Sequence, residues 1–275
     1  MKRRTGLLFA AGLLLVALGM EICARRAGNR ADALWRTAFC PESPLCGEDA
    51  RALLTQEEEN SLVVWRELQN QTVTDPDMGR QARATATVLL GSAGLAFPAV
   101  TALAGEDTDG CLIGEQTAWE LFGSTGVVGE EICVGEERRT IRAVVKQPAD
   151  GVILAGYGED FTYNRITLES REAAESFQMR SGLKGQLLRL DYFRNPGWLL
   201  ELIPGKWSDF SGWKANIGQK KKDFAFLFSA EKTVPECLYE EQCFIYWCCR
   251  GVAVLCVVVV VWGSSYGKNQ SLSMT

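Results

Sequence analysis

The fold of this chain is decided by one stretch, Gly110 to Val145, which reads GCLIGEQTAWELFGSTGVVGEEICVGEERRTIRAVV. Its first apolar residues, Cys111–Ile113, predict a short strand. Two later runs, Ile132–Val134 and Thr140–Val145, alternate as the strands of a hairpin, with Gly135-Glu136-Glu137 as the turn between them. The order strand, helix, hairpin indicates a packing unit, and the stretch contains no pattern typical of a catalytic centre.

The middle of this stretch predicts a helix of two turns. Thr117 is expected to cap it, because a threonine hydroxyl can accept a hydrogen bond from a free N–H group of the first turn. Gly123 is expected to end it, since glycine readily adopts the left-handed conformation that closes many helices. The helical period places Ala118, Leu121 and Phe122 on the buried side.

Strand and helix patterns alternate along the rest of the central region. Alternation of apolar and polar residues predicts strands at Ala84–Leu90 and Gln186–Phe193, and two short strands are expected at Val152–Leu154 and Arg165–Leu168. Helices are expected in two places: from the cap Ser170 to Arg180, with Ala173, Ala174 and Phe177 buried, and over Trp198–Ile203. The predicted fold class is therefore α+β, a mixed domain of short strands, hairpins and helices.

Composition excludes several classes of function. The chain has 275 residues, enough for a substantial core, and a net charge of −5. Its basic residues are scattered, so we expect no nucleic-acid partner. It contains no histidine, which excludes Ser-His-Asp and Cys-His catalysis and histidine-ligated zinc. We therefore expect that the chain is not an enzyme.

Both ends of the chain are apolar. Gly6–Met20 fits an uncleaved signal anchor or a signal peptide, and an anchor is favoured because residues 22 and 24 are poor for cleavage. Phe244–Gly263 predicts a second span, with Trp247 and Trp262 in the aromatic belts. Arg250 is the one charge in it, and its long side chain is expected to reach outward to the membrane surface. These segments predict a two-span protein of the cell membrane, with both termini inside and the main domain extracytoplasmic.

The chain is accordingly divided into six segments. They are an N-terminal transmembrane helix or signal anchor (1–23), a helical lead-in (24–60), an extracytoplasmic core domain (61–205), an amphipathic membrane-proximal segment (206–242), a C-terminal transmembrane helix (243–263) and a short tail (264–275). Residues 206–230 combine aromatic residues with Lys220-Lys221-Lys222. They predict either an amphipathic approach to the membrane or a surface helix packed on the domain.

Candidate sites are few. Cys40 and Cys46 bracket a tight loop that a disulfide could close. Residues 105–110 have the composition of a calcium loop, but Gly105 and Gln116 fall where two of the ligands are needed, so a solvated turn is expected. No catalytic, cofactor-binding or metal-binding residues are identified, and no cofactor is expected.

The opening stretch resembles the MacB-type periplasmic core domain of FtsX-like ABC transporter permeases. The resemblance is carried by elements that occur in order over about 40 residues and extend upstream and downstream. These elements are Gly110–Ile113, Ala118 with Leu121-Phe122-Gly123, Val127-Val128-Gly129, Ile141–Val145, Arg80–Leu90 and Val152–Ala155.

This resemblance implies an α+β extracytoplasmic domain inserted after the first transmembrane helix, a lipid-embedded chain, and an ABC ATP-binding subunit and further membrane subunits as partners. Such permeases usually have four spans, whereas two are found here. We expect a permease-like or accessory membrane subunit of an ABC-type transport or mechanotransmission system. The alternative is a membrane-tethered extracytoplasmic binding or sensing module without an ATPase partner.

Overall fold

The computed structural model describes residues 2–56, 61–97, 103, 107–156, 161–169, 177–203 and 210–272. The chain divides into two units. One is helical and contains residues 1–34, 191–196 and 237–275. The other contains residues 35–190 and 197–236 and is the α+β domain that the sequence predicts. The α+β fold class is therefore confirmed.

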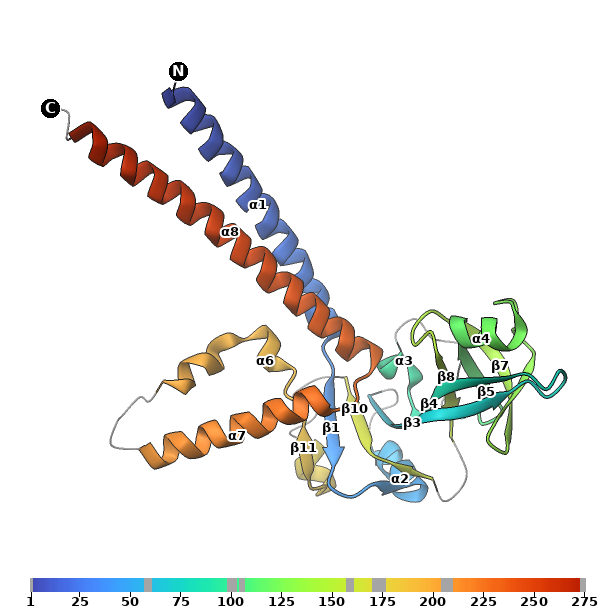
Figure 1. Ribbon diagram of the computed structural model, residues 1–275. Helices are drawn as coiled ribbons and strands as arrows, with labels where there is room; N and C mark the ends of the chain where they lie inside the picture. Colours follow the sequence, from blue (N-terminus) through green and yellow to red (C-terminus); the bar gives the residue numbers. More distant parts are fainter. Residues whose placement is uncertain are drawn as a thin grey trace. The chain divides into compact units, whose positions relative to one another are not determined.

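The helical unit consists of two long helices and one short one (Figure 1). They are α1 (Lys2–Leu34), α6 (Asp191–Arg194) and α8 (Val234–Leu272). The first three residues of α8 belong to the α+β unit. Within the described residues, one helix, Val234–Gly263, is long and apolar enough to cross a membrane. The second span, in α1, stays a prediction.

The α+β unit is built on a sheet of nine strands, in the order β11-β1-β10-β3-β4-β8-β5-β7-β6. Their bounds are β1 (Thr37–Pro41), β3 (Leu62–Thr74), β4 (Gln81–Gly91), β5 (Gly110–Gly114), β6 (Glu131–Val134), β7 (Glu137–Val145), β8 (Gly151–Ala155), β10 (Arg165–Leu168) and β11 (Gly185–Leu187). A separate pair joins β2 (Leu45–Cys46) to β9 (Thr162–Tyr163). The remaining elements are α2 (Gly47–Gln56), α3 (Ala93–Ala96), α4 (Glu115–Phe122), η1 (Pro196–Leu202) and α7 (Phe210–Ser229).

Strand β3 takes part in two different regions of this sheet. Its first four residues, Leu62–Trp65, pair with β10, and its last residues, Val73 and Thr74, pair with β6. The pairing with β4 shifts register between Leu68 and Gln71, where Asn70 has a φ of 55°. Such a bulge bends and twists a strand. Because of it, β3, β4, β8, β5, β7 and β6 are paired in a closed ring.

Alternating residues of the central strands are buried on both faces. Val64, Val88 and Leu154 belong to a large core that includes Ala118 and Leu121 of α4. Neighbours in the sequence such as Leu89 and Ile153 belong to a second core, with α3 and Leu103. Ala84, Ala86 and Val88 of β4 all face the first core, which fits the alternation of the predicted strand, and the expected burial of Phe177 is confirmed.

Two predictions of secondary structure are wrong. The helical lead-in ends at Leu34, and the following residues form β1, because β10 and β11, more than a hundred residues downstream, supply its hydrogen bonds. The strand expected over Gln186–Phe193 ends at Leu187, and Asp191–Arg194 forms α6 within the helical unit.

Other predictions fall partly outside the described residues. Ser170, Ala173 and Ala174 lie outside them, whereas residues 177–181 are helical. Pro196–Leu202 forms a 3-10 helix where a helix was expected, and α7 confirms a helix in 206–230. The bounds of the six segments stay predictions.

Candidate functional site

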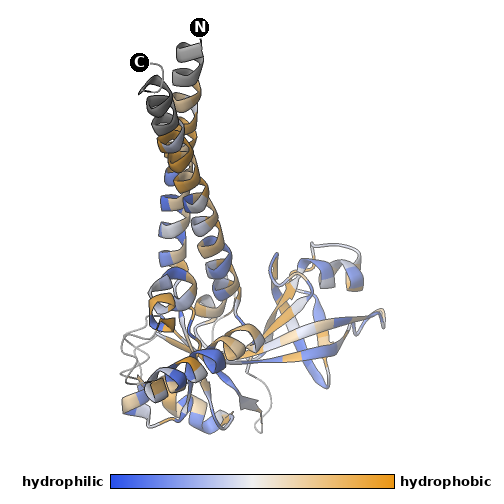
Figure 2. Ribbon diagram, turned by 60° about the vertical axis from the view of Figure 1, so that its left-hand side comes forward, coloured by the Kyte–Doolittle hydropathy of each residue, from blue (hydrophilic) through white to orange (hydrophobic). Residues whose placement is uncertain are grey.

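The two long helices meet along a seam of small residues. Ala17, Ala24 and Ala31 recur every seven residues of α1, and all three are buried. Ala17 packs with Ala253 and Cys256 of α8. Small side chains let two helix backbones approach closely, which is the usual way in which helices associate in a bilayer. Figure 2 shows apolar residues along the turns of α1 and α8 that lie just inside the grey ends of the two helices.

Charged residues join the same two helices. Arg250 Nε of α8 lies 3.7 Å from Glu21 Oε2 of α1, and Glu21 Oε1 lies 3.5 Å from Arg25 Nε. Arg250 Nη1 also donates a hydrogen bond of 2.7 Å to the hydroxyl of Tyr246. The guanidinium of Arg250 is thus held by Glu21 and Tyr246, while its outward reach to the membrane surface stays a prediction.

A second charged contact lies further along the helix pair. Arg194 of α6 donates to both carboxylate oxygens of Asp32, with Nε–Oδ1 3.3 Å and Nη2–Oδ2 3.4 Å. Its guanidinium also stands 4.3 Å from the ring centroid of Tyr246. Gly28 makes room for it, since a Cβ there would lie 3.0 Å from Arg194 Nη2. One side chain thus contacts α1 and α8 at once.

The backbone of α6 is held as well. Trp247 Nε1 donates a hydrogen bond of 2.8 Å to the carbonyl oxygen of Phe193. Among the described residues between 35 and 236, those that group with the helical unit are 191–196. A movement of α1 against α8 therefore acts directly on Asp191–Arg194, which is covalently continuous with the α+β unit on both sides. We call this arrangement of Asp32, Phe193, Arg194, Tyr246 and Trp247 the α6 clamp.

Sequence reasoning missed the α6 clamp, although α1 carries a signal for it. Glu21, Arg25, Gly28 and Asp32 follow the spacing i, i+4, i+7 and i+11, which places them on one face of a helix. Three charged residues and a glycine in one stripe beyond an apolar run indicate a polar contact surface. The partner Arg194, 162 positions from Asp32, could not be found from helical periodicity.

Within the α+β unit, the helix α4 is capped differently from the prediction. Its N-cap is Gly114, and the N–H groups of Gln116 and Thr117 both donate to the carbonyl oxygen of Ala149, at 2.9 Å and 3.3 Å. A Cβ at position 114 would lie 2.2 Å from that oxygen, so glycine is required for the approach. Thr117 is buried inside the helix instead of capping it. The end of α4 at Gly123, with a φ of 69°, is confirmed.

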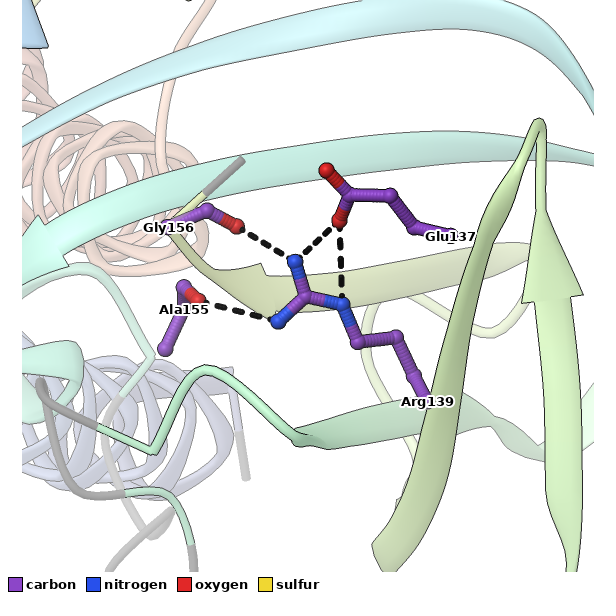
Figure 3. Close-up of polar contacts among 4 residues, drawn as sticks. All are labelled: Glu137, Arg139, Ala155 and Gly156. Carbon is purple, nitrogen blue, oxygen red and sulfur yellow. Dashed lines mark hydrogen bonds and ion pairs between the residues drawn. The ribbon is translucent and has the colours of Figure 1, made fainter. Parts of the chain in front are cut away.

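Arg139 is a buried cation in the same unit (Figure 3). It forms an ion pair with Glu137, two residues earlier on β7. Its Nη1 and Nη2 donate to the carbonyl oxygens of Ala155 and Gly156, at 3.3 Å and 3.1 Å. The end of β8 is thereby fixed to β7. All three guanidinium nitrogens are used internally, which indicates a structural role.

The remaining candidates from the sequence are engaged in structure. Asp107 pairs with Arg142 through two hydrogen bonds of 2.8 Å and 3.2 Å, and Arg142 holds the pKa of Asp107 below its usual value. Residues 108–109 form a turn, while Gly105 and Glu106 lie outside the described residues. The disulfide considered for Cys40 and Cys46 is not formed, since all ten cysteines are free thiols. The two lie on β1 and β2, which belong to different sheets.

Cys40 is unsuited to chemistry because of its surroundings. The thiol is buried beside Arg165, which donates to its sulfur. Burial raises the pKa of Cys40 to about 11 in spite of this neighbouring cation. Little thiolate exists at neutral pH, and the thiolate is the reactive form. Cys40 is therefore a core residue.

Glu67 on β3 is a carboxylate of the α+β unit with an unusual protonation. Burial, and after it the negative charge of Glu231, raises its pKa to about 7, although Arg165 acts in the opposite direction. Gln69 Nε2 donates a hydrogen bond of 3.2 Å to its Oε2. Glu67 is therefore partly protonated near neutral pH, a property that no sequence pattern indicated.

Comparisons with known proteins identify structures of similar fold. No protein-family model matches the chain, and no curated protein matches it. The crystal structure of the periplasmic region of MacB from Actinobacillus actinomycetemcomitans is similar, with 13% identity and a TM-score of 0.46 over 62% of this chain and 94% of that one. The extracellular domain of the noncanonic ABC-type transporter YknZ from Gram-positive bacteria matches with 15% identity and a TM-score of 0.40, over 55% of this chain and 96% of that one.

Proposed function

We propose that this chain is a permease-like or accessory membrane subunit of an ABC-type transport or mechanotransmission system. The resemblance of residues 110–145 to a MacB-type core domain supports an extracytoplasmic domain of this class. The helix Val234–Gly263 supports a place in the membrane. In this role the chain catalyses no reaction, and it transmits movement between the membrane helices and the external domain.

The observation that carries the proposal is the double contact of Arg194. The guanidinium binds Asp32 on α1 and stacks on Tyr246 on α8. A change in the distance or rotation between the two helices cannot preserve both contacts, so α6 must follow or release one helix. Because α6 is part of the chain that leads into the α+β unit at Leu190 and Gly197, such a change reaches the external domain through the backbone.

The partner is tested by affinity purification of the full chain from membranes of its native host, solubilised in mild detergent. We expect an ATP-binding subunit to be recovered with it, and ATP hydrolysis by the recovered complex to depend on the chain. Recovery of the intact chain alone, after cross-linking in cells as well as without it, would contradict the proposal and favour a tethered binding or sensing module. Trp119 on α4, 57% exposed, and Val128, 63% exposed, would then be the first residues to test for ligand contact.

The role of the clamp is tested on the same complex with two variants. Arg194→Ala removes both contacts and is expected to weaken the dependence of ATP hydrolysis on the chain while the complex stays assembled. Arg138→Ala, which removes an exposed ion pair with Glu131 at 3.2 Å, is the matched control and should leave the dependence of ATP hydrolysis on the chain unchanged. Equal behaviour of the two variants would show that the α6 clamp transmits nothing.

A further inference from the structure

In the part of the chain that the structure describes, the surface formed by η1 and the adjoining α7 exposes several large apolar side chains. Leu200 is 74% exposed and Ile203, directly after η1, is 66% exposed. On α7, Phe210 and Phe228 are also exposed. Five exposed apolar residues on two adjoining elements, with Leu199 as the fifth, exceed the isolated exposed side chains found on most protein surfaces.

The two elements form one layer. Trp213 Nε1 of α7 donates a hydrogen bond of 3.1 Å to the carbonyl oxygen of Leu202. The rings of Trp198 and Phe224 meet edge to face, with centroids 4.7 Å apart. Lys220, nearly buried, pairs with Glu201 at 2.8 Å. The inner faces of η1 and α7 are therefore used against each other, and the leucines of η1 remain outside.

The η1–α7 layer is rich in basic residues on α7. Phe210–Ser229 contains four lysines and one acidic residue, Asp223, in a chain whose net charge is −5. One lysine is neutralised by Glu201, and the other three, Lys214, Lys221 and Lys222, are exposed. Exposed lysines beside exposed apolar residues are typical of segments that lie in the interface of a membrane with anionic lipids.

The chain also enters and leaves this layer next to residues of the membrane helix. Phe193, three positions before Pro196 begins η1, accepts the hydrogen bond of Trp247, the tryptophan expected in the aromatic belt of the span. At the other end, four residues, 230–233, separate the end of α7 from the start of α8. The layer is thus tethered at both ends to the helix that carries the candidate span.

We infer that the η1–α7 layer binds the anionic headgroup surface of the membrane, with Leu199, Leu200 and Ile203 entering the interface and Lys214, Lys221 and Lys222 meeting lipid phosphates. This inference requires that α8 is embedded in a membrane, and it does not require an ATPase partner. The layer would hold the external domain against the bilayer by contacts that depend on lipid charge and salt.

The test uses the full chain in lipid nanodiscs with a fluorescent amino acid at Leu200, and brominated lipids that quench only probes within the bilayer. With anionic phosphatidylglycerol we expect strong quenching. Quenching should fall several-fold in discs of phosphatidylcholine alone, and also at high salt. The same probe at Met78, exposed on the β3–β4 hairpin, is the control and should remain unquenched.

A second variant separates charge from folding. Lys214→Gln, Lys221→Gln and Lys222→Gln together leave the Lys220–Glu201 pair intact and should lower quenching at Leu200 in anionic discs. The comparison of anionic with phosphatidylcholine discs, made with all three lysines present, tests the same dependence on charge without these substitutions. Quenching at Leu200 no greater than at Met78 would overturn the inference. It would also be overturned if the probe at Leu200 were shielded from aqueous iodide but not quenched by the brominated lipids, because protein and not lipid would then cover the layer. Quenching independent of lipid charge, salt and the lysines would overturn the assignment of anionic lipid.

Discussion

Arg250 of α8 and Glu21 of α1, 229 positions apart in the chain, meet across the helix pair at 3.7 Å between Nε and Oε2. This contact lies on the same stripe of α1 as Asp32, which holds Arg194. Glu21 contacts α8 directly, whereas Asp32 is joined to α8 through Arg194, whose guanidinium lies over the ring of Tyr246. One stripe of α1 therefore contacts α8 at two levels, once directly and once through α6.

The first prediction concerns this pair. In a double-mutant cycle with Glu21→Gln and Arg250→Gln, we expect a coupling energy of about 0.5–1 kcal/mol, since both side chains are partly exposed and Glu21 keeps a second partner in Arg25. The free energy of unfolding is measured in detergent micelles. Purely additive effects of the two substitutions would show that the contact contributes nothing to the packing of α1 on α8.

The second prediction concerns Arg139. Arg139→Ala should lower the free energy of unfolding of the α+β unit by about 3–5 kcal/mol, because Glu137 and two carbonyl oxygens lose a buried partner. Arg139→Lys should restore little of it, since one ammonium group cannot serve three acceptors in the same geometry. Chemical denaturation measures both.

The control for Arg139 is its neighbour in sequence. Arg138 forms an exposed ion pair with Glu131, and Arg138→Ala should cost less than about 0.5 kcal/mol. A similar loss of stability in both variants would mean that Arg139 is held no more firmly than a surface residue, and that the end of β8 is fixed by other contacts.

The third prediction is a dependence of stability on pH. The pKa of Glu67 is raised to about 7 in the folded chain, above its value of 4.5 in the unfolded chain. The folded state therefore binds the proton more tightly, so this contribution to stability is complete below about pH 4.5 and is lost as the pH rises through 7. Glu67→Gln should raise the melting temperature relative to the parent chain at pH 8 and leave it nearly unchanged at pH 4.5.

Melting curves recorded between pH 4.5 and pH 8 give the difference in melting temperature between Glu67→Gln and the parent chain. Glu130→Gln, at an exposed position, is the control and should show no such trend. If the difference between Glu67→Gln and the parent chain does not vary with pH, Glu67 keeps the same protonation in the folded and the unfolded chain, and its burial has no electrostatic consequence.

The fourth prediction concerns the orientation of the chain in the membrane. In a background without the native cysteines, a cysteine at Asp150, which is exposed in the α+β unit, should react with a membrane-impermeant maleimide in intact cells. A cysteine at Ser271, beyond the candidate span, should react only after the cells are opened. Labelling of position 271 alone in intact cells would place the domain in the cytoplasm.

Local patterns accounted for much of the α+β unit. The strands β4, β5, β6, β7, β8 and β10 and the helix α4 occur where alternation and helical period predicted them, and Gly123 ends α4 as expected. These elements have strong patterns because their residues face a core on at least one side. The failures have a common cause: β1, α6 and the N-terminus of α4 are each decided by a partner distant in the sequence, namely β10 with β11, Asp32 with Trp247, and Ala149.

The sequence by itself determined the class of this protein: an α+β domain, an apolar helix of membrane length near the C-terminus, and no histidine for the commonest catalytic chemistry. Those conclusions depend on composition and on period, which are properties of neighbouring residues. Only the tertiary structure decided that Arg250 binds Glu21, that Arg194 joins α1 to α8, and that Arg139 is buried and satisfied. The reason is physical, because an ion pair or a hydrogen bond depends on the distance between two groups in space, and no local pattern contains that distance for groups on different strands or helices.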